Sequence, residues 1–300
     1  MATVEPSGDI LGATIHGFDL SQPLARRDLG LILKTIGLYG VVRFPGQSLT
    51  PEAQEAFGTQ FGPIHSSSKN HDAGREGISV LSNIVENGKN IGYADAGLIW
   101  HRDMTYETTP GFANILYGIT IPKRDGKTLG PTQFVNTLAA GDDLPADVLA
   151  RLKGAIGVHN PAIYNVTIRA AGSKRAAFDK LPRQMALTRH PILLDHPFIG
   201  RPVLYCDINH VETIEGLPED EAAELLELLI AQQNKPQYQW SFTWTEGDVL
   251  MWDNLTTMHR VIVDFRPDEI RLIKRCQVLG DGIFDPAFIG PMLAEAGVAA

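Results

Sequence analysis

Cysteine is scarce in this chain, and so are long apolar runs and positive charge. Only Cys206 and Cys276 occur among 300 residues, too few for a disulfide framework, and their apolar surroundings predict buried, reduced thiols. No uninterrupted apolar stretch approaches the length that spans a bilayer. The N-terminus has no basic region followed by an apolar run. We therefore expect a cytoplasmic protein without a membrane partner.

The charge balance is acidic, with 26 basic and 35 acidic residues and a formal net charge of -9. Such a balance argues against a polyanionic partner, so we expect no binding to nucleic acid. The chain has no linker rich in Pro, Gly or Ser, and its 44% hydrophobic content is enough for a large core. We expect residues 1–300 to form a single domain.

Periodicity predicts a strand-rich protein with helices near both ends. Apolar spacing predicts helices at 24–38, 145–152 and 218–232, and Thr50 followed by Pro51 predicts a capped helix start. The expected strands are 112–121, 132–136, 203–207, 240–244, 249–252 and 270–279. This layout predicts a mixed α/β, mainly β fold: a double-stranded β-helix, or jelly-roll barrel, buttressed by helices.

Two distant segments contain residues typical of a metal site. His101 and Asp103 are two positions apart, so in an extended chain both side chains would lie on one face. His259 can supply a third ligand after the chain folds back. Two histidines and one carboxylate on one side of a metal form the facial triad of non-haem ferrous oxygenases, which leaves the opposite positions open.

Two arginines follow the second histidine, Arg271 after 12 residues and Arg275 after 16. In the expected strand 270–279 they would share one face. Guanidinium groups that point into a core are costly without anionic partners, and Arg is suited to binding a carboxylate through two hydrogen bonds. The arginines are therefore candidates for binding small anions, or they pair with acidic residues at a rim.

From about residue 12 to 285 the chain resembles the taurine dioxygenase / 2,4-dichlorophenoxyacetate dioxygenase family of Fe(II)- and 2-oxoglutarate-dependent oxygenases. The motifs that carry the resemblance occur in the family's order. They are Gly12–Leu20, Val41–Gln47, Phe57–Pro63, Trp100-His101-Arg102-Asp103, Gly130-Pro131-Thr132, Gly247–Asn254, His259, Arg271 and Arg275.

The resemblance implies a role for each matching position. His101, Asp103 and His259 would bind iron and be the catalytic centre. Arg271, with Thr132, would bind 2-oxoglutarate, the cosubstrate used together with O2. Arg275 would bind an acidic group of the primary substrate, a small carboxylate, sulfonate or phosphonate. Family members also often form dimers or tetramers, so the resemblance implies a homo-oligomer.

Further site residues are implied less directly. Tyr106 and His210 occupy positions that often face the substrate in the family, although His210 is equally typical of a hydrogen-bonded structural histidine. The segment between Asp103 and Thr132 is about four residues longer than is usual in the family, which leaves Thr128 as a rival for the role of Thr132. Thr132 is favoured for this role because Phe134 then keeps its place in the family's pattern.

Three function classes remain compatible with the residues. The first is a 2-oxoglutarate-dependent hydroxylase of a small organic acid. The resemblance implies that the carboxylate at Asp103 favours hydroxylation or a related oxidation, such as desaturation, over halogenation. The second is a zinc hydrolase with the same three ligands, which would have no use for Arg271 and Thr132 gathered around one small diacid. The third is a non-catalytic barrel that binds a small acid, which would not need open metal positions.

Overall fold

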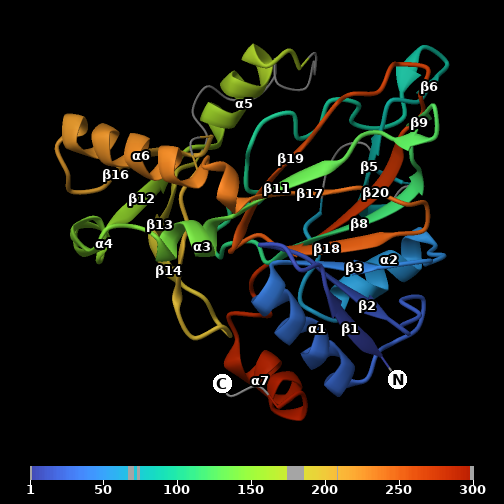
Figure 1. Cartoon of the computed structure of the whole chain (residues 1–300), viewed down its shortest axis with the longest axis horizontal. Helices are drawn as coiled ribbons and strands as arrows, with labels where there is room; N and C mark the ends of the chain where they lie inside the picture. The colour runs from blue at the N-terminus through green and yellow to red at the C-terminus, as the bar shows by residue number, and fades with distance from the viewer. Residues whose placement is uncertain (1, 67–70, 73–74, 174–185, 208, 298–300) are drawn as a thin grey trace.

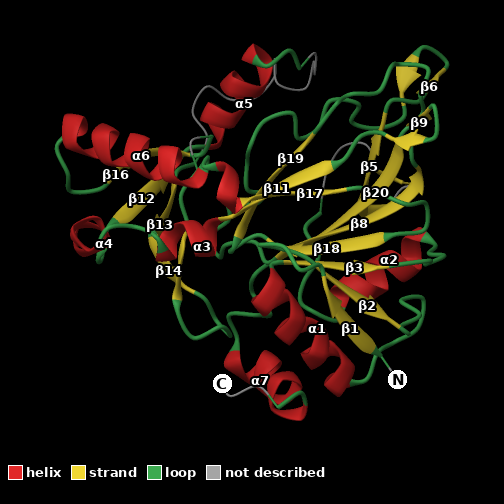
Figure 2. Ribbon diagram, in the orientation of Figure 1, coloured by secondary structure: helices red, strands yellow, loops and turns green. Residues whose placement is uncertain are grey.

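The fold was determined as a computed structural model, which describes residues 2–66, 71–72, 75–173, 186–207 and 209–297. Among these residues strands outnumber helices, and most strands lie in two sheets that face each other. Helices gather along the outer face of the larger sheet and at the opposite side of the molecule from β6 and β9 (Figure 2). No helix among the described residues is long and apolar enough to cross a membrane.

The larger sheet has eight strands and occupies the right half of the view in Figure 1, above α1 (Arg26–Tyr39) and α7 (Pro286–Glu295). Its neighbouring strands are antiparallel except for β2 and β3, which are parallel. The order across the sheet is β1 (Thr3–Pro6), β2 (Ala13–His16), β3 (Val41–Phe44), β18 (Val249–Asp253), β8 (Ala113–Thr120), β20 (Leu272–Val278), β5 (Arg75–Ser82) and β4 (His71–Asp72).

The smaller sheet has three strands, β17 (Gln239–Phe242), β11 (Thr132–Asn136) and β19 (Thr257–Val261), with β11 in the middle. Inward side chains of this sheet, such as Phe134 and Phe242, share one buried cluster with Leu116 and Trp252 of the larger sheet. Alternate residues of both sheets thus form a common core between them.

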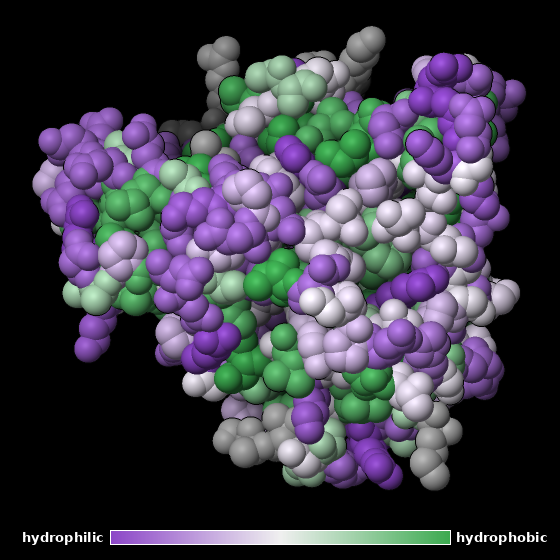
Figure 3. Space-filling view, viewed as in Figure 1, coloured by the Kyte–Doolittle hydropathy of each residue, from purple (hydrophilic) through white to green (hydrophobic). Residues whose placement is uncertain are grey.

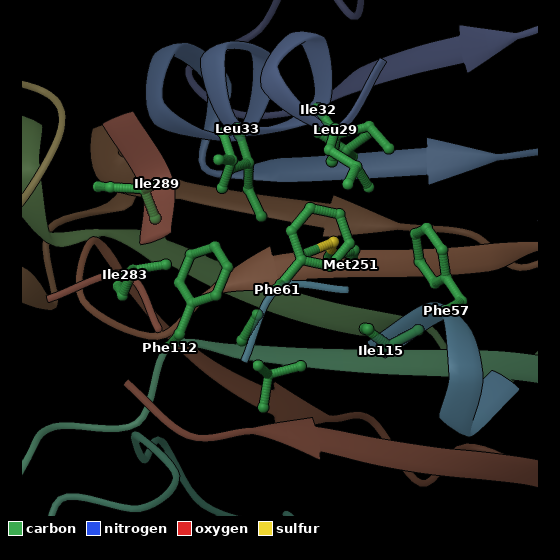
Figure 4. Close-up of a cluster of buried hydrophobic side chains, with 14 of the residues drawn as sticks. Leu29, Ile32, Leu33, Phe57, Phe61, Phe112, Ile115, Met251, Ile283 and Ile289 are labelled. Atoms are coloured by element: carbon green, nitrogen blue, oxygen red, sulfur yellow. The ribbon is translucent and has the colours of Figure 1, made fainter. Parts of the chain in front are cut away.

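Three helices cover the other face of the larger sheet. Figure 4 shows apolar side chains of these helices meeting side chains of β8 and β18 in the largest buried cluster. The predicted cap is present, since the Thr50 side chain accepts a hydrogen bond from the Ala53 amide with Pro51 at the helix start. The helices are α1 (Arg26–Tyr39), α2 (Pro51–Thr59) and α7 (Pro286–Glu295).

A second cluster of elements lies beside the smaller sheet. Its apolar core is formed mainly by α4, α6 and the strands between them. The elements are α3 (Thr137–Asp142), α4 (Ala146–Leu152), β12 (Ile156–His159), α5 (Pro161–Ala170), β13 (Thr188–Pro191), β14 (Leu193–Asp195), β15 (Pro202–Leu204), β16 (Val211–Ile214), α6 (Glu219–Gln233) and the short helix η2 (Pro236–Tyr238). Two small hairpins complete the fold, β6 (Val85–Glu86) with β7 (Lys89–Asn90) and β9 (Lys123–Arg124) with β10 (Lys127–Thr128).

Most predicted elements are confirmed to within a few residues. The strand expected at 203–207 is the main difference, because β15 ends at Leu204. Tyr205 then donates its amide to Ile192, and the chain turns at Asp207. Both cysteines are free and buried, as expected. Helices α5 and α7 lie outside every predicted range.

Candidate metal centre and cosubstrate cavity

His101, Asp103 and His259 come together at one end of the space between the two sheets. One potential ligand atom from each residue lies within 4.8 Å of the others. His101 forms an isolated antiparallel bridge with His259, in which each backbone amide donates to the other carbonyl, at 3.1 and 2.9 Å. The chain therefore fixes the two imidazoles side by side, with ring centroids 4.2 Å apart.

Asp103 reaches the same point from a turn. Only His101 has a strand-type bridge, and a turn that contains Met104 at φ +58° follows at once. The side chains of His101 and Asp103 thus converge as expected. The backbone, however, is not extended after Arg102, where the turn begins. The turn brings the Asp103 carboxylate to 3.6 Å from His101 Nε2 and 3.8 Å from His259 Nε2.

The electrostatics of the three groups suit metal ligands. Burial lowers the pKa of both His101 and His259, so their imidazoles are neutral near pH 7. Burial opposes ionisation of Asp103, but the neighbouring Arg275 guanidinium outweighs it and holds the pKa of the carboxyl well below its usual range. Neutral imidazoles and a carboxylate are the protonation states that bind a divalent metal, so the three residues fit one.

A small cavity of about 40 Å³ opens beside the triad. Both metal-site histidines line it together with Thr132, Arg271 and Arg275. Arg271 is buried, and burial lowers the pKa of its guanidinium to about 10. No acidic group among the described residues is within ion-pair distance of it, so its cation faces the cavity without a counter-ion. The cavity can therefore bind a small anion next to a metal.

Local features hold Arg271 and Thr132, the two residues expected to bind the cosubstrate, in place. Gly130 has φ +70°, and a Cβ there would lie 3.1 Å from Arg271 Nε, so glycine lets the guanidinium pass. The buried Trp244 indole donates a 3.0 Å hydrogen bond to Thr132 Oγ1. Thr128 lies in the β9–β10 hairpin, paired with Lys123, and is not part of the cavity lining.

The residues expected to contact substrate lie in different surroundings. Arg275 lines the cavity and donates from Nη1 to Asp103 at 3.0 Å, while its buried Nε has no hydrogen-bond partner among the described residues. Tyr106 exposes 38% of its surface and packs edge-on against His65. Neither Tyr106 nor His210 lines the small cavity.

His210 is buried and hydrogen-bonded, as the structural alternative predicted. Its Nδ1 lies 3.0 Å from Asp207, whose pKa is held at about 2 by His210 although burial opposes ionisation. Its ring stacks on Tyr164, which in turn lies 5.2 Å from the His101 ring. His210 thus reaches the metal centre through Tyr164, a residue that sequence reasoning did not single out.

Comparison with known proteins decides the family. The model of the taurine catabolism dioxygenase TauD, TfdA family matches residues 3–277. The chain belongs to this family. Pentalenolactone F synthase of Streptomyces arenae is 31% identical over 96% of this chain and 97% of its own. Alpha-ketoglutarate-dependent 2,4-dichlorophenoxyacetate dioxygenase of Cupriavidus pinatubonensis is 25% identical, with 85% and 90% covered.

The fold agrees with this assignment. A crystal structure of a taurine dioxygenase from Burkholderia xenovorans superposes with a TM-score of 0.74, at 30% identity, over 93% of this chain and 91% of that one. The protein is therefore an Fe(II)- and 2-oxoglutarate-dependent dioxygenase. Family membership decides for this class over the zinc hydrolase and the non-catalytic binding protein.

One buried residue of the dioxygenase that sequence reasoning missed is Arg102, between the two metal-site residues. It is fully buried. Its Nε donates to the Thr257 carbonyl at 3.3 Å, and its Nη2 donates to Thr137 Oγ1 and the Leu204 carbonyl. Its guanidinium also lies 4.5 Å from the centre of the Tyr205 ring. Because Thr257 is two residues before His259, Arg102 ties the loop with His101 and Asp103 to the strand with His259.

Replacing Arg102 is expected to weaken metal binding. Arg102→Met removes all three hydrogen bonds, so we expect Co(II) affinity, measured by calorimetry on folded protein, to fall by about tenfold or more, as for other residues that orient ligands. Arg43→Met is the matched control. Arg43 lies on β3 of the larger sheet and, like Arg102, bonds to a buried group, the Asp248 carboxylate. Equal Co(II) affinity in Arg102→Met and Arg43→Met would contradict this role.

His159 predicts a pH dependence of stability. It is fully buried against His190 and Tyr205, neither ring nitrogen has a partner among the described residues, and burial lowers its pKa to about 3. The unfolded chain takes up this proton near pH 6.5, so stability falls as pH drops below that value. We expect a loss of about 2 kcal/mol between pH 7 and pH 5 from this residue.

His159→Phe should lose about 2 kcal/mol less than the natural chain over the same interval. The measurement is urea denaturation of the metal-free protein at both pH values. The other buried histidines titrate equally in both proteins, so they cancel in the difference. If both proteins lost the same free energy of unfolding between pH 7 and pH 5, His159 would already be protonated in the folded state at pH 5.

Proposed function

We propose that this dioxygenase oxidises, by hydroxylation, a C–H bond of a small anionic substrate, a carboxylate, sulfonate or phosphonate. The observation that carries the proposal is the single cavity in which two metal-site histidines lie beside an unpaired buried cation, Arg271, and a second arginine, Arg275. Arg271 would bind the cosubstrate 2-oxoglutarate, and Arg275 would bind the anionic substrate. The products besides the oxidised substrate are succinate and CO2.

His101, Asp103 and His259 would hold Fe(II) on one side and leave the remaining positions for 2-oxoglutarate and O2. When bound, iron and 2-oxoglutarate together reduce O2, so that one oxygen atom enters the substrate and the other enters succinate. The chain's own contribution is placement. Arg271 and Thr132 would bind the distal carboxylate of 2-oxoglutarate and orient it towards the triad.

Arg275 would hold the acidic group of the substrate. Its Nη1 is already committed to Asp103, but its unpaired Nε offers a donor in a nearly dry environment. An anion placed there lies next to the metal ligands, which limits the distance between the oxidised C–H bond and the acidic group. Tyr106 and His210 would contact the substrate from the sides, His210 together with Tyr164.

Expectations about fold, assembly, location and partners also belong to the proposal. The two facing sheets would form the double-stranded β-helix, or jelly-roll barrel, expected from the sequence, within a single domain of residues 1–300. The enzyme would assemble as a homo-oligomer, a dimer or tetramer, in the cytoplasm. The chain's acidic charge supports small molecules over nucleic acid as partners.

Succinate formation tests the reaction class. We expect the Fe(II)-loaded protein to convert 2-oxoglutarate to succinate in air, and Arg271→Met to raise the KM for 2-oxoglutarate by about 100-fold, because it removes a charge-assisted carboxylate contact in a buried site. Co(II) affinity should stay unchanged in this variant and fall sharply in His101→Ala. Normal 2-oxoglutarate dependence in Arg271→Met would remove that residue from the cosubstrate site.

A substrate screen tests the role of Arg275. Small carboxylates, sulfonates and phosphonates are ranked by succinate release coupled to substrate loss, and the best is compared with its neutral amide or ester. We expect Arg275→Met to raise the KM of the anion by about tenfold or more but to leave the KM of the neutral analogue unchanged. A parallel rise for both compounds would show that Arg275 acts only through Asp103.

A further inference from the structure

Strand β19 has a cavity on each side. His259 and Val261 line the small cosubstrate cavity, whereas Met258 and Arg260, which alternate with them, line a second cavity of about 300 Å³. Successive side chains of a strand point to opposite faces. The second cavity is therefore separated from the metal centre by the strand itself and shares no lining residue with the cosubstrate cavity.

The second cavity lies where α5 and the C-terminal end of α6 approach the smaller sheet (Figure 1). In the space-filling view, apolar residues also gather near the top of the molecule, between the positions of α5 and β6, while hydrophilic residues cover its left and right edges (Figure 3). The volume of the second cavity, about 300 Å³, is that of a pocket for a small organic molecule. The apolar side chains of Leu98, Ile99, Ile230 and Met258 are part of its lining.

Arg260 brings to this pocket a cation that has no ion-pair partner among the described residues. Its guanidinium lies 4.3 Å from the centre of the Trp100 ring, and its Nε donates to Gln133 Oε1 at 2.9 Å. Burial lowers the pKa of Arg260, and no carboxylate within the described part of the chain is within ion-pair distance of it. The carboxylate in the lining, Asp207, already accepts hydrogen bonds from the Asn209 amide and the His210 ring.

We propose that this outer pocket binds a small organic anion with an apolar body. The Arg260 guanidinium, held in orientation by Trp100 and Gln133, would bind the carboxylate through its remaining N–H groups. The hydrocarbon part would pack against Leu98, Ile230 and Met258. This site is additional to the proposed catalytic function, whose cations Arg271 and Arg275 lie in the cavity on the other side of β19.

The pocket also touches the supports of the metal centre. Trp100 immediately precedes His101, and Met258 immediately precedes His259. An occupant would contact the segments that carry both imidazoles without touching the ligands. A bound anion is therefore expected to change the visible absorption of the Co(II)-loaded protein.

Titration with phenylacetate tests the proposal. The protein is loaded with Co(II) and saturated with 2-oxoglutarate, so that the cosubstrate cavity is occupied. Binding is followed by calorimetry and by the indole N–H signal of Trp100. We expect saturable binding that shifts this signal, and binding of the neutral isostere phenylacetamide about tenfold weaker or worse, because it lacks the charge-assisted contact.

Four variants separate the outer pocket from the catalytic cavity. Arg260→Met and the cavity-filling Ile230→Trp should each weaken phenylacetate binding by about tenfold or more. Arg275→Met should leave the phenylacetate-dependent shift of the Trp100 signal unchanged, because Trp100 lines the outer pocket and Arg275 does not. Arg189→Met, which changes an exposed arginine paired with Glu215, should leave binding unchanged altogether. Loss of binding in Arg275→Met with retention in Arg260→Met would place the anion in the catalytic cavity and overturn the proposal. So would equal affinity for phenylacetamide, or no binding.

Discussion

The paired backbone hydrogen bonds between His101 and His259 are the constraint on which the rest of the site depends. They join a loop to a strand more than 150 residues later in the chain and set the two imidazoles side by side. Everything else at the centre is arranged around this bridge: Asp103 follows through a tight turn, and Arg102 adds side-chain bonds to Thr257. Contacts that fix the orientation of the ligands in this way raise metal affinity.

The charges around the bridge are balanced by specific neighbours. Burial keeps the histidines neutral, and Arg275 keeps Asp103 ionised despite burial. Within the described part of the chain Arg271 has no such neighbour, and burial of its cation is unfavourable unless an anion binds. If 2-oxoglutarate binds at Arg271 as proposed, its distal carboxylate would supply the opposite charge, and the stability of the site would be coupled to cosubstrate binding.

Sequence reasoning succeeded where local signals decide structure. The Thr50 cap and the apolar stripe of α6 depend on residues within a few positions of each other. It missed α7, where Gly290 and Pro291 resemble a helix stop, and α5, only two of whose side chains are buried. Tertiary contacts stabilise such helices, and no local pattern reveals them.

The same limit applies to the site. Motif order predicted the triad and both arginines as one site, and the structure brings these side chains together. The hydrogen-bond partners of Arg102 and Arg260 lie 35 to 155 residues away in the chain, and these contacts exist only after folding. Strand alternation explains Arg260, which follows His259 on β19 and faces away from the metal centre. Arg102 lies outside any strand, and its hydrogen bonds to Thr257 and Thr137 hold it away from the metal. In this fold that outward side is buried under α3, α5 and α6, so the neighbours of the ligands acquire binding and positioning roles of their own.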